Sequence, residues 1–465
     1  MHPVNATLPF SLGEVLDAAK TVLGVPLLPA DINLEVRLMA ASYADKLRSY
    51  RLGVLSGDVA LARQRQHALF LAPCTKVVCF LLAYPSWSER LTFENAKLQA
   101  ARVNPRNPSD EKVYATERLK RSGGTRWTCS YGPRARSAQR MVEHIIFMAA
   151  DPSPYEYARE GRGRERAAAT VLDAIENKGV RWFGIADVKD FFPSVTREMV
   201  RKALPFLPAS IVDATIFIHD DTDICTHAPS EHTHNNSAQA IRAGLPQGSI
   251  SSLIVASKVL QPHLDALHAR LAAVHVDNVL VGGKTGAEAE TMLNALASSL
   301  GKQSAGSLRL TTGVYRLGDP DMDFLGYRFR RRWRSFGGFG RAEPADRGFR
   351  RLYFRTALAL LLASPEHWTD FIENTCARWV RGYPSWEGRF RAEYFAILGL
   401  ELDLLPRLSS AQVKIVKQKV RWKSFSELRD DLMAYATHFA DTAEKMFTSG
   451  GKAALIGNGL VSNEF

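Results

Sequence analysis

The chain has 465 residues, of which 46% are hydrophobic and 23% are charged, an ordinary composition for a globular protein. Lysine and arginine outnumber aspartate and glutamate by 60 to 48, and the net charge of +12 favours a polyanionic partner such as nucleic acid. Five scattered cysteines argue against a disulfide framework, and we find neither a secretory signal nor an apolar run of ~20 residues, so we expect a cytoplasmic protein.

The first region, residues 1–110, has the pattern of a helical extension that carries no catalytic motif. Ser11 and Glu14 form a capping box, which predicts the start of a helix, and Gly24 predicts its end. A second helix is expected over Asn33–Leu52.

A basic hairpin is predicted next, over residues 119–130, with Ser-Gly-Gly at its tip. Lys120, Arg121 and Arg126 lie in this hairpin and would suit a polyphosphate. A helix over Ala138–Ala150 is expected to follow.

Two aspartates then stand in similar settings, each beside apolar residues that predict a buried strand. Asp187 lies in Phe183-Gly-Ile-Ala-Asp-Val-Lys-Asp-Phe-Phe-Pro-Ser-Val195, and Asp277 lies in Ala273-Val-His-Val-Asp-Asn-Val-Leu-Val281. A Gly/Ser loop, Gly244–Ser252, separates them in the chain. Because Mg²⁺ prefers carboxylate oxygens, and phosphoryl transfer uses two ions about 3.5–4 Å apart, this arrangement predicts a two-metal nucleotidyl-transfer site.

The remaining chain changes character after the second aspartate. A basic, glycine-rich passage from Arg328 to Gly340 marks a subdomain boundary, and the chain is again helical from about residue 347. The last residues, 448–465, are rich in Gly, Ser and Asn and are expected to form a flexible tail.

These blocks resemble, in order and spacing, the motifs of bacterial-type reverse transcriptases, the branch that includes retron and phage-defence enzymes. The Asp187 block resembles motif A, Gly244–Ser252 resembles motif B, and Phe324–Tyr327 resembles motif E. His275-Val-Asp-Asn278 takes the place of motif C, which is usually Tyr-x-Asp-Asp. The resemblance covers residues 112–335.

The fold that this resemblance implies is an α+β right-hand polymerase. Fingers and palm, with an antiparallel palm sheet, would occupy residues 111–335, after the helical N-terminal extension of residues 1–110. A helical thumb would occupy residues 336–447, and the flexible tail residues 448–465.

The activity that the resemblance implies is RNA-directed DNA polymerisation, in which two Mg²⁺ ions (or Mn²⁺) join dNTPs. The expected partners are an RNA template, such as a dedicated noncoding RNA in antiphage defence, and the DNA product. A second protein subunit or a homo-oligomer is also compatible with the sequence, and no membrane is expected.

The resemblance also implies a role for individual residues. The implied catalytic residues are Asp187 and Asp277, and the implied metal ligands are Asp187, Val188, Asp277 and Asn278. The implied nucleotide-binding residues are Lys120, Arg121, Arg126, Phe192, Gln247 and Gly248, with the Phe192 ring excluding a 2′-OH. The implied primer and template contacts are His275, Leu325, Gly326 and Arg330.

Two departures from the family pattern leave alternatives open. Asn278 is neutral where the family usually has a second acid, and the lysine expected before motif E is missing, with only Arg309 or Arg316 near its place. One alternative is a catalytically weakened nucleic-acid-binding subunit that acts with a partner polymerase. Another is a template-independent DNA polymerase.

Overall fold

The computed structural model describes residues 7–119, 125–151, 153–158, 162–227, 237–302, 305–319, 321–331 and 340–345. The predicted thumb and tail, and the hairpin tip with Lys120 and Arg121, lie outside these residues and stay predictions. The described chain combines helices with β-sheets, as the predicted α+β class requires.

The chain divides into two compact units, and each is described by itself. The first comprises Met1–Arg159, Ala186–Val279 and Glu290–Gly313, and the second comprises Glu160–Ile185, Leu280–Ala289 and Val314–Phe465. The predicted domain boundaries come from the motif resemblance and do not coincide with these two units, so they stay predictions.

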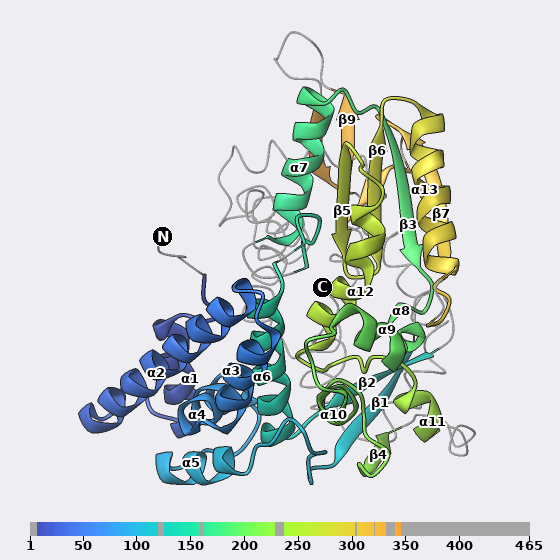
Figure 1. Ribbon diagram of the computed structural model, residues 1–465. Helices are drawn as coiled ribbons and strands as arrows, with labels where there is room; N and C mark the ends of the chain where they lie inside the picture. Colours follow the sequence, from blue (N-terminus) through green and yellow to red (C-terminus); the bar gives the residue numbers. More distant parts are fainter. Residues whose placement is uncertain are drawn as a thin grey trace, which may run out of the picture. The chain divides into compact units, whose positions relative to one another are not determined.

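Five helices form the N-terminal part of the first unit (Figure 1). They are α1 (Leu12–Leu23), α2 (Ala30–Leu55), α3 (Val59–Leu71), α4 (Pro73–Ala83) and α5 (Phe93–Ala101). The predicted capping box is confirmed, because Ser11 accepts from the backbone of Glu14 while the Glu14 carboxylate accepts from the backbone of Ser11. Helix α1 ends at Gly24, as predicted, and the structure shows that Gly24 adopts the left-handed conformation.

Helix α4 is the centre of this helical group. It is apolar on nearly all sides and packs against α1, α2, α5 and α6 (Pro133–Ala149), which explains its burial. The Tyr43 hydroxyl lies 2.9 Å from Nδ1 of the buried His144 and so links α2 to α6, and the Phe10 ring stacks on both rings. Burial holds the pKa of His144 well below its usual range, so its imidazole is neutral.

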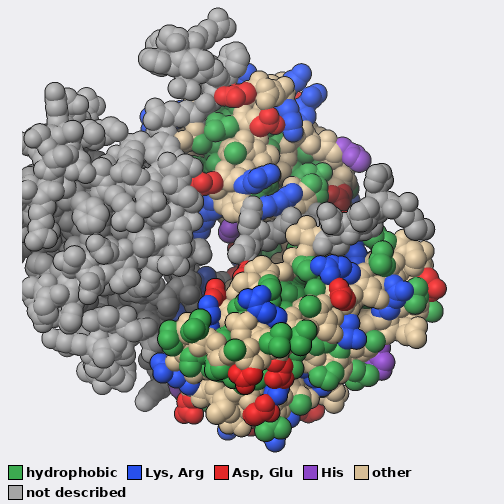
Figure 2. Space-filling model, turned by 90° about the vertical axis from the view of Figure 1, so that its left-hand side faces the viewer, with side chains coloured by type: hydrophobic (Ala, Val, Ile, Leu, Met, Phe, Trp, Pro, Cys, Tyr) green, Lys and Arg blue, Asp and Glu red, His purple; other side chains and the backbone are tan. Residues whose placement is uncertain are grey.

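In the described residues, no single helix is long and apolar enough to cross a membrane, although the bent pair α3 and α4 together has the necessary length and composition. The surface of the N-terminal helices carries exposed leucines, including Leu34, Leu38 and Leu98. Figure 2 shows hydrophobic side chains interspersed with both signs of charge.

The predicted basic hairpin is confirmed as β1 (Val113–Leu119) paired antiparallel with β2 (Thr125–Ser130). Strand β4 (Ile224–His227) joins the other edge of β1 in parallel. One face of this small sheet packs into an apolar cluster that includes Val113, Ala115 and Cys129. Because side chains alternate along a strand, Arg118 and its cross-strand partner Arg126 belong to the opposite face.

The second sheet has the order β5-β6-β3-β7. Its strands are β3 (Trp182–Val188), β5 (Leu271–His275), β6 (Asn278–Gly283) and β7 (Leu310–Arg316). On one side, backbone hydrogen bonds join the β3 segment to the β5–β6 hairpin, from Val188 to Asp277 and from Arg181 to Gly283. On the other side, backbone hydrogen bonds join it to the residues that flank β7, from Lys189 to Arg309 and from Leu317 to Arg181. In each pair one number rises as the other falls, so β3 runs antiparallel to both neighbours.

The other helices are α7 (Gly163–Asn177), α8 (Phe191–Ser194), α9 (Arg197–Ala203), α10 (Ala209–Ile211), the π-helix η1 (Val212–Ile216), α11 (Ser237–Arg242), α12 (Ser252–Asp265) and α13 (Gly286–Gly301). The third sheet is formed by β8 (Asp323–Phe324), β9 (Tyr327–Arg331) and β10 (Gly340–Pro344) in the order β10-β9-β8.

Candidate active site

The two predicted catalytic aspartates are brought together by backbone pairing. Asp187 is the penultimate residue of β3, and the N–H of the next residue, Val188, donates to the carbonyl of Asp277 at 3.0 Å. The residues before Asp187 are mostly buried in the sheet, whereas its own side chain is exposed. The apolar strand thus anchors a carboxylate that faces solvent.

The turn that carries Asp277 is strained. Strands β5 and β6 are joined by the two residues Val276 and Asp277, and Val276 has φ 62°. Two-residue hairpin turns place Gly or Asn at such positions, because a β-branched side chain is crowded at positive φ. Strain of this kind is found at functional sites, where the surrounding structure enforces it.

Asn278 contacts the neighbouring carboxylate directly. Its Nδ2 donates to Oδ1 of Asp277 at 2.8 Å. The amide therefore orients Asp277 by a hydrogen bond, and its oxygen is the atom left with the capacity to bind a metal. The role of that oxygen as a metal ligand stays a prediction.

The electrostatics of this cluster favour a cation. Although the Asp187 side chain reaches solvent, neighbouring protein atoms partly desolvate its carboxylate, and this desolvation, followed by the charges of Asp277 and Asp190, raises its pKa from 3.8 to about 6. Burial also raises the pKa of Asp277, against the opposing effects of hydrogen bonds and of the positive charge of Arg126. Mutual repulsion among carboxylates is relieved when a cation binds between them.

The donor set fits Mg²⁺ bound together with a substrate. Within the described residues, no group of three or more His, Cys, Asp or Glu side chains is arranged to hold a metal ion. Mg²⁺, however, is commonly held by one or two carboxylates plus substrate phosphates and water. Asp187, Asp277 and the carbonyl of Val188 carry hard oxygen atoms of that kind, and their role as metal ligands stays a prediction.

One arginine of the hairpin interacts electrostatically with this cluster, and a second arginine is its partner across the strand pair. Arg126 is near enough for its charge to lower the pKa of Asp277, and its binding of a triphosphate stays a prediction. Arg118 stands directly across the strand pair from Arg126, and its buried Nε has no hydrogen-bond partner among the described residues.

The two phenylalanines after Asp187 differ in their surroundings. Phe191 is buried, whereas Phe192 is only half-buried, and their ring centroids are 5.8 Å apart. Phe191 is therefore the core residue of the pair, which leaves Phe192 available for the predicted contact with a sugar.

The Gly/Ser loop is attached by its backbone to both neighbouring motifs. The N–H of Leu245 donates to the Phe192 carbonyl at 2.7 Å, and the N–H of Cys129 on β2 donates to the Gln247 carbonyl at 2.6 Å. These bonds hold the half-buried Gln247 between the hairpin and the segment after Asp187.

Glycine is required at two places in this loop. Gly244 has φ 72°, and a Cβ there would lie 2.2 Å from the Phe192 carbonyl oxygen. Gly248 has φ 108°, and a Cβ there would lie 2.1 Å from the Cys129 carbonyl oxygen. Only a residue without a side chain permits both close approaches.

Side chains fix the rest of the loop. The buried Gln139 of α6 accepts from the N–H of Ile250 at 3.1 Å, and the Ser252 hydroxyl donates to the Pro246 carbonyl at 2.8 Å. The loop is thus rigid at both ends, as a support under a ligand must be.

Strand β7 separates Arg309 from Arg316, the two arginines that lie near the sequence position where the family has a lysine. The carbonyl of Arg309 accepts from the N–H of Lys189, two residues after Asp187. Arg316 is at the other end of β7, with its guanidinium over the Trp182 ring. Of the two arginines, Arg309 therefore lies at the Asp187 end of the sheet, paired through its backbone with Lys189.

The predicted primer and template contacts fall in different parts of the structure. His275 ends β5, next to the strained turn. Leu325 and Gly326 form the two-residue β8–β9 turn, with φ 55° and 82°, and Arg330 is exposed on β9. The last three residues belong to the second unit, so their approach to Asp187 stays a prediction.

Sequence reasoning missed two residues of the site. Asp190 lies in the block around Asp187, where the resemblance implies no role for it, although its charge contributes to the raised pKa of Asp187. Arg118 precedes the predicted hairpin by one residue, and only the cross-strand register pairs it with Arg126. Alternation along the strand would have been the signal for Arg118.

Comparisons with known proteins identify no family. No protein-family model matches the chain, and no curated protein matches its sequence. Among solved structures, the chain is similar to the Sicinivirus 3Dpol RNA-dependent RNA polymerase, with a TM-score of 0.35 and 12% identity. The match covers 60% of this chain and 64% of that polymerase chain, less than two thirds of its length. A likeness at this level does not establish a shared activity.

Gly248→Ala is expected to destabilise the protein by about 2–4 kcal/mol, because it adds a clash with the Cys129 carbonyl to an unfavourable φ. Gly57→Ala is the matched control, since Gly57 has φ 73° but no atom within 4 Å of an added Cβ. The control should lose only about 1 kcal/mol. Urea unfolding of both variants measures the difference, and equal losses would contradict the confinement of the loop by β2.

Asp187→Asn is expected to stabilise the metal-free protein at pH 7.5 by up to about 1 kcal/mol, a figure reduced for solvent screening of an exposed side chain. Between pH 4 and 6 the folded wild type binds a proton at Asp187 that the unfolded chain has lost, so this group's contribution to stability falls as pH rises. The gain from the substitution should therefore shrink towards pH 4. Denaturant titrations in EDTA test this, and a variant less stable than wild type at pH 7.5 would contradict it.

Proposed function

We propose that the protein is an RNA-directed DNA polymerase that joins dNTPs by two-metal nucleotidyl transfer. The observation that carries the proposal is the pairing of the Asp187 strand with the Asp277 turn through the Val188–Asp277 hydrogen bond, beside Arg126. This arrangement supports the proposal because it brings two carboxylates, which would bind metal ions, near a cation that would suit a phosphate. A dedicated noncoding RNA as template and a role in antiphage defence belong to the same proposal by resemblance alone.

In this proposal the chain's own residues bind and orient the substrate. Asp187, Asp277 and the Val188 carbonyl would hold two Mg²⁺ ions, whose charge, when present, stabilises the attacking and departing oxygens. Arg126 and Arg118 would bind the triphosphate of the incoming dNTP. Arg309 and Lys189 would offset the charge of the departing pyrophosphate from the β7 side.

The loop and the aromatic ring would select the substrate. The loop from Gly244 to Gly248, held by its two backbone bonds, would support the templating base, with Gln247 beneath it. The half-buried Phe192 ring would lie under the sugar and exclude a 2′-hydroxyl, which favours dNTPs over ribonucleotides.

A second function, a reverse-transcriptase-like subunit that binds nucleic acid beside an active partner, is favoured by one observation. Asn278 donates its amide N–H to Asp277, so it behaves as an orienting group, and the site has one acid fewer than the motif C of the family. Metal affinity would then be low in this chain alone.

Incorporation of labelled dNTPs by the purified protein with its co-purifying RNA tests the proposal. Wild type should incorporate, Asp187→Ala should lose roughly 10²–10³-fold, and Asn278→Asp should gain activity at low Mg²⁺ because it restores a charge. Sequencing of the product separates templated from untemplated synthesis. The proposal fails if wild type and Asn278→Asp are both inactive, an outcome that the binding subunit predicts, or if Asp187→Ala remains fully active.

Phe192→Ala is expected to raise ribonucleotide use relative to dNTP use by about 10–100-fold, because it removes the steric clash with the 2′-hydroxyl. The matched control is Phe191→Leu, which alters the buried neighbour and should lower stability without changing the sugar preference. Single-nucleotide incorporation with each substrate measures the ratio. An unchanged ratio in Phe192→Ala would contradict the role of this ring.

A further inference from the structure

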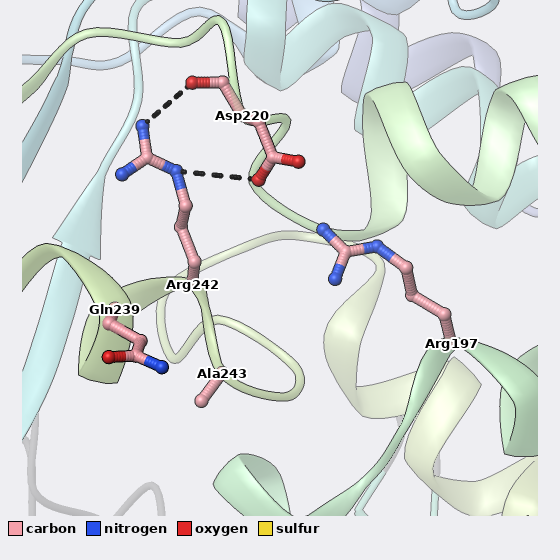
Figure 3. Close-up of a pocket in the computed structure, with 5 residues that line it drawn as sticks. All are labelled: Arg197, Asp220, Gln239, Arg242 and Ala243. Carbon is pink, nitrogen blue, oxygen red and sulfur yellow. Dashed lines mark hydrogen bonds and ion pairs between the residues drawn. The ribbon is translucent and has the colours of Figure 1, made fainter.

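A pocket of about 490 Å³ lies in the first unit beside the Gly/Ser loop, and none of the roles described above uses it. It is lined by Arg197, Asp220, Gln239, Arg242 and Ala243 (Figure 3). Ala243 directly precedes Gly244, so one wall of the pocket continues into the loop. The volume is in the range of small-molecule sites.

Arg242 is fixed in the pocket by backbone carbonyls. Its Nη2 donates to the carbonyls of Asp220 and Thr222 at 3.0 and 2.8 Å, and its Nε donates to that of His219 at 3.5 Å. The nearest carboxylate oxygen, on Asp220, is 3.9 Å from Nε. Nη1 has no partner among the described residues, so it remains available as a donor.

Arg197 offers a second donor group from across the pocket. Its Nη2 donates to the Ile218 carbonyl at 3.2 Å, and its guanidinium lies over the Phe217 ring with 4.9 Å to the centroid. Its ion pair with Asp213 is loose, at 3.5 Å, because Arg201 binds that carboxylate at 2.7 Å. In the described part of the chain, Nη1 of Arg197 also has no partner.

Acceptors complete the lining. The Asp220 carboxylate is highly exposed and lies between the two arginines in Figure 3, and the Gln239 amide has no partner among the described residues. Asp221 and Asp223 follow closely in the chain. The charged lining consists of two arginines and one carboxylate, so a phosphate would pair with the arginines and leave Asp220 unmatched, whereas a neutral group with both donors and acceptors would satisfy both kinds of side chain.

We propose that this pocket binds the guanine base of an unpaired nucleotide. Guanine presents the acceptors O6 and N7, which arginine recognises, and beside them the donors N1–H and N2–H₂, which suit the Asp220 carboxylate. Adenine lacks this set, because its six-membered ring offers an acceptor at N1 and no 2-amino group.

The strand that supplies the base follows from the position of the pocket and rests on the proposed function. If the Gly244–Gly248 loop supports the templating base, the pocket beside Ala243 is placed to receive an unpaired guanine of the template. Binding of that guanine would then make DNA synthesis pause at a fixed position relative to guanines in the template.

Binding of fluorescent single-stranded RNA decamers tests the proposal with the full chain in EDTA, which removes any metal-dependent binding. The decamers contain uridine with one central guanosine, inosine, adenosine or cytidine. The guanosine decamer should bind about tenfold more tightly than the adenosine and cytidine decamers, with inosine between them because it lacks the 2-amino group.

Asp220→Asn should weaken binding of the guanosine decamer about tenfold and abolish the difference between guanosine and inosine. Asp221→Asn is the matched control, since it removes the same charge one residue away and should leave the preference intact. Both residues are highly exposed, so neither change endangers folding.

Equal binding of all four decamers, a preference for cytidine, or equal effects of the two variants would overturn the proposal. Free guanosine monophosphate that competes as tightly as the decamer would support the guanine site and overturn the template strand as its source. The binding measurement does not depend on catalysis. A protein that prefers guanosine but incorporates no dNTP would therefore support the guanine site and contradict the proposed polymerase activity. A protein that incorporates dNTPs but binds all four decamers equally would support the polymerase activity and contradict the guanine site.

Discussion

The hydrogen bond between the Val188 N–H and the Asp277 carbonyl is the contact on which the candidate site depends. It closes β3 against the β5–β6 turn and so brings two carboxylates from distant parts of the sequence to one end of the sheet. The closure is opposed by partial desolvation of the two carboxylates, which raises the pKa of each, and at Asp187 also by the charges of Asp277 and Asp190. The buried strands on either side supply the burial free energy that holds the two acids together.

The Gly/Ser loop shows a second way of building a precise site. Its contacts with the hairpin and with the segment after Asp187 are made by backbone atoms, and glycine permits them by leaving no side chain in the way. Backbone contacts vary less than side-chain contacts, because they have no rotamers to lose. The same loop continues through Ala243 into the lining of the pocket of Arg197 and Arg242.

Much of this could be predicted from the sequence, for identifiable reasons. The capping box at Ser11, the hairpin around Arg126 and the strand before Asp187 depend on local patterns, and the structure contains all three. The orientation of the Asn278 amide and the different positions of Arg309 and Arg316 depend on strand pairing, which local patterns do not contain. The pocket could not be predicted, because its lining residues come from α9, α11 and a connecting turn that are separated in the sequence, and no recognisable sequence motif links them. The predicted thumb and the Lys120–Arg121 tip lie outside the described residues.

The burial of α4 has a consequence for the order in which the chain can fold during synthesis. This helix packs against α1, α2 and α5, which precede or closely follow it, but also against α6, which begins at Pro133. Until the ribosome has released α6, the apolar face of α4 that meets it has nothing to cover it. The nascent N-terminal helices would therefore be a target for chaperones, and they would complete their core only when the hairpin and α6 have followed them out.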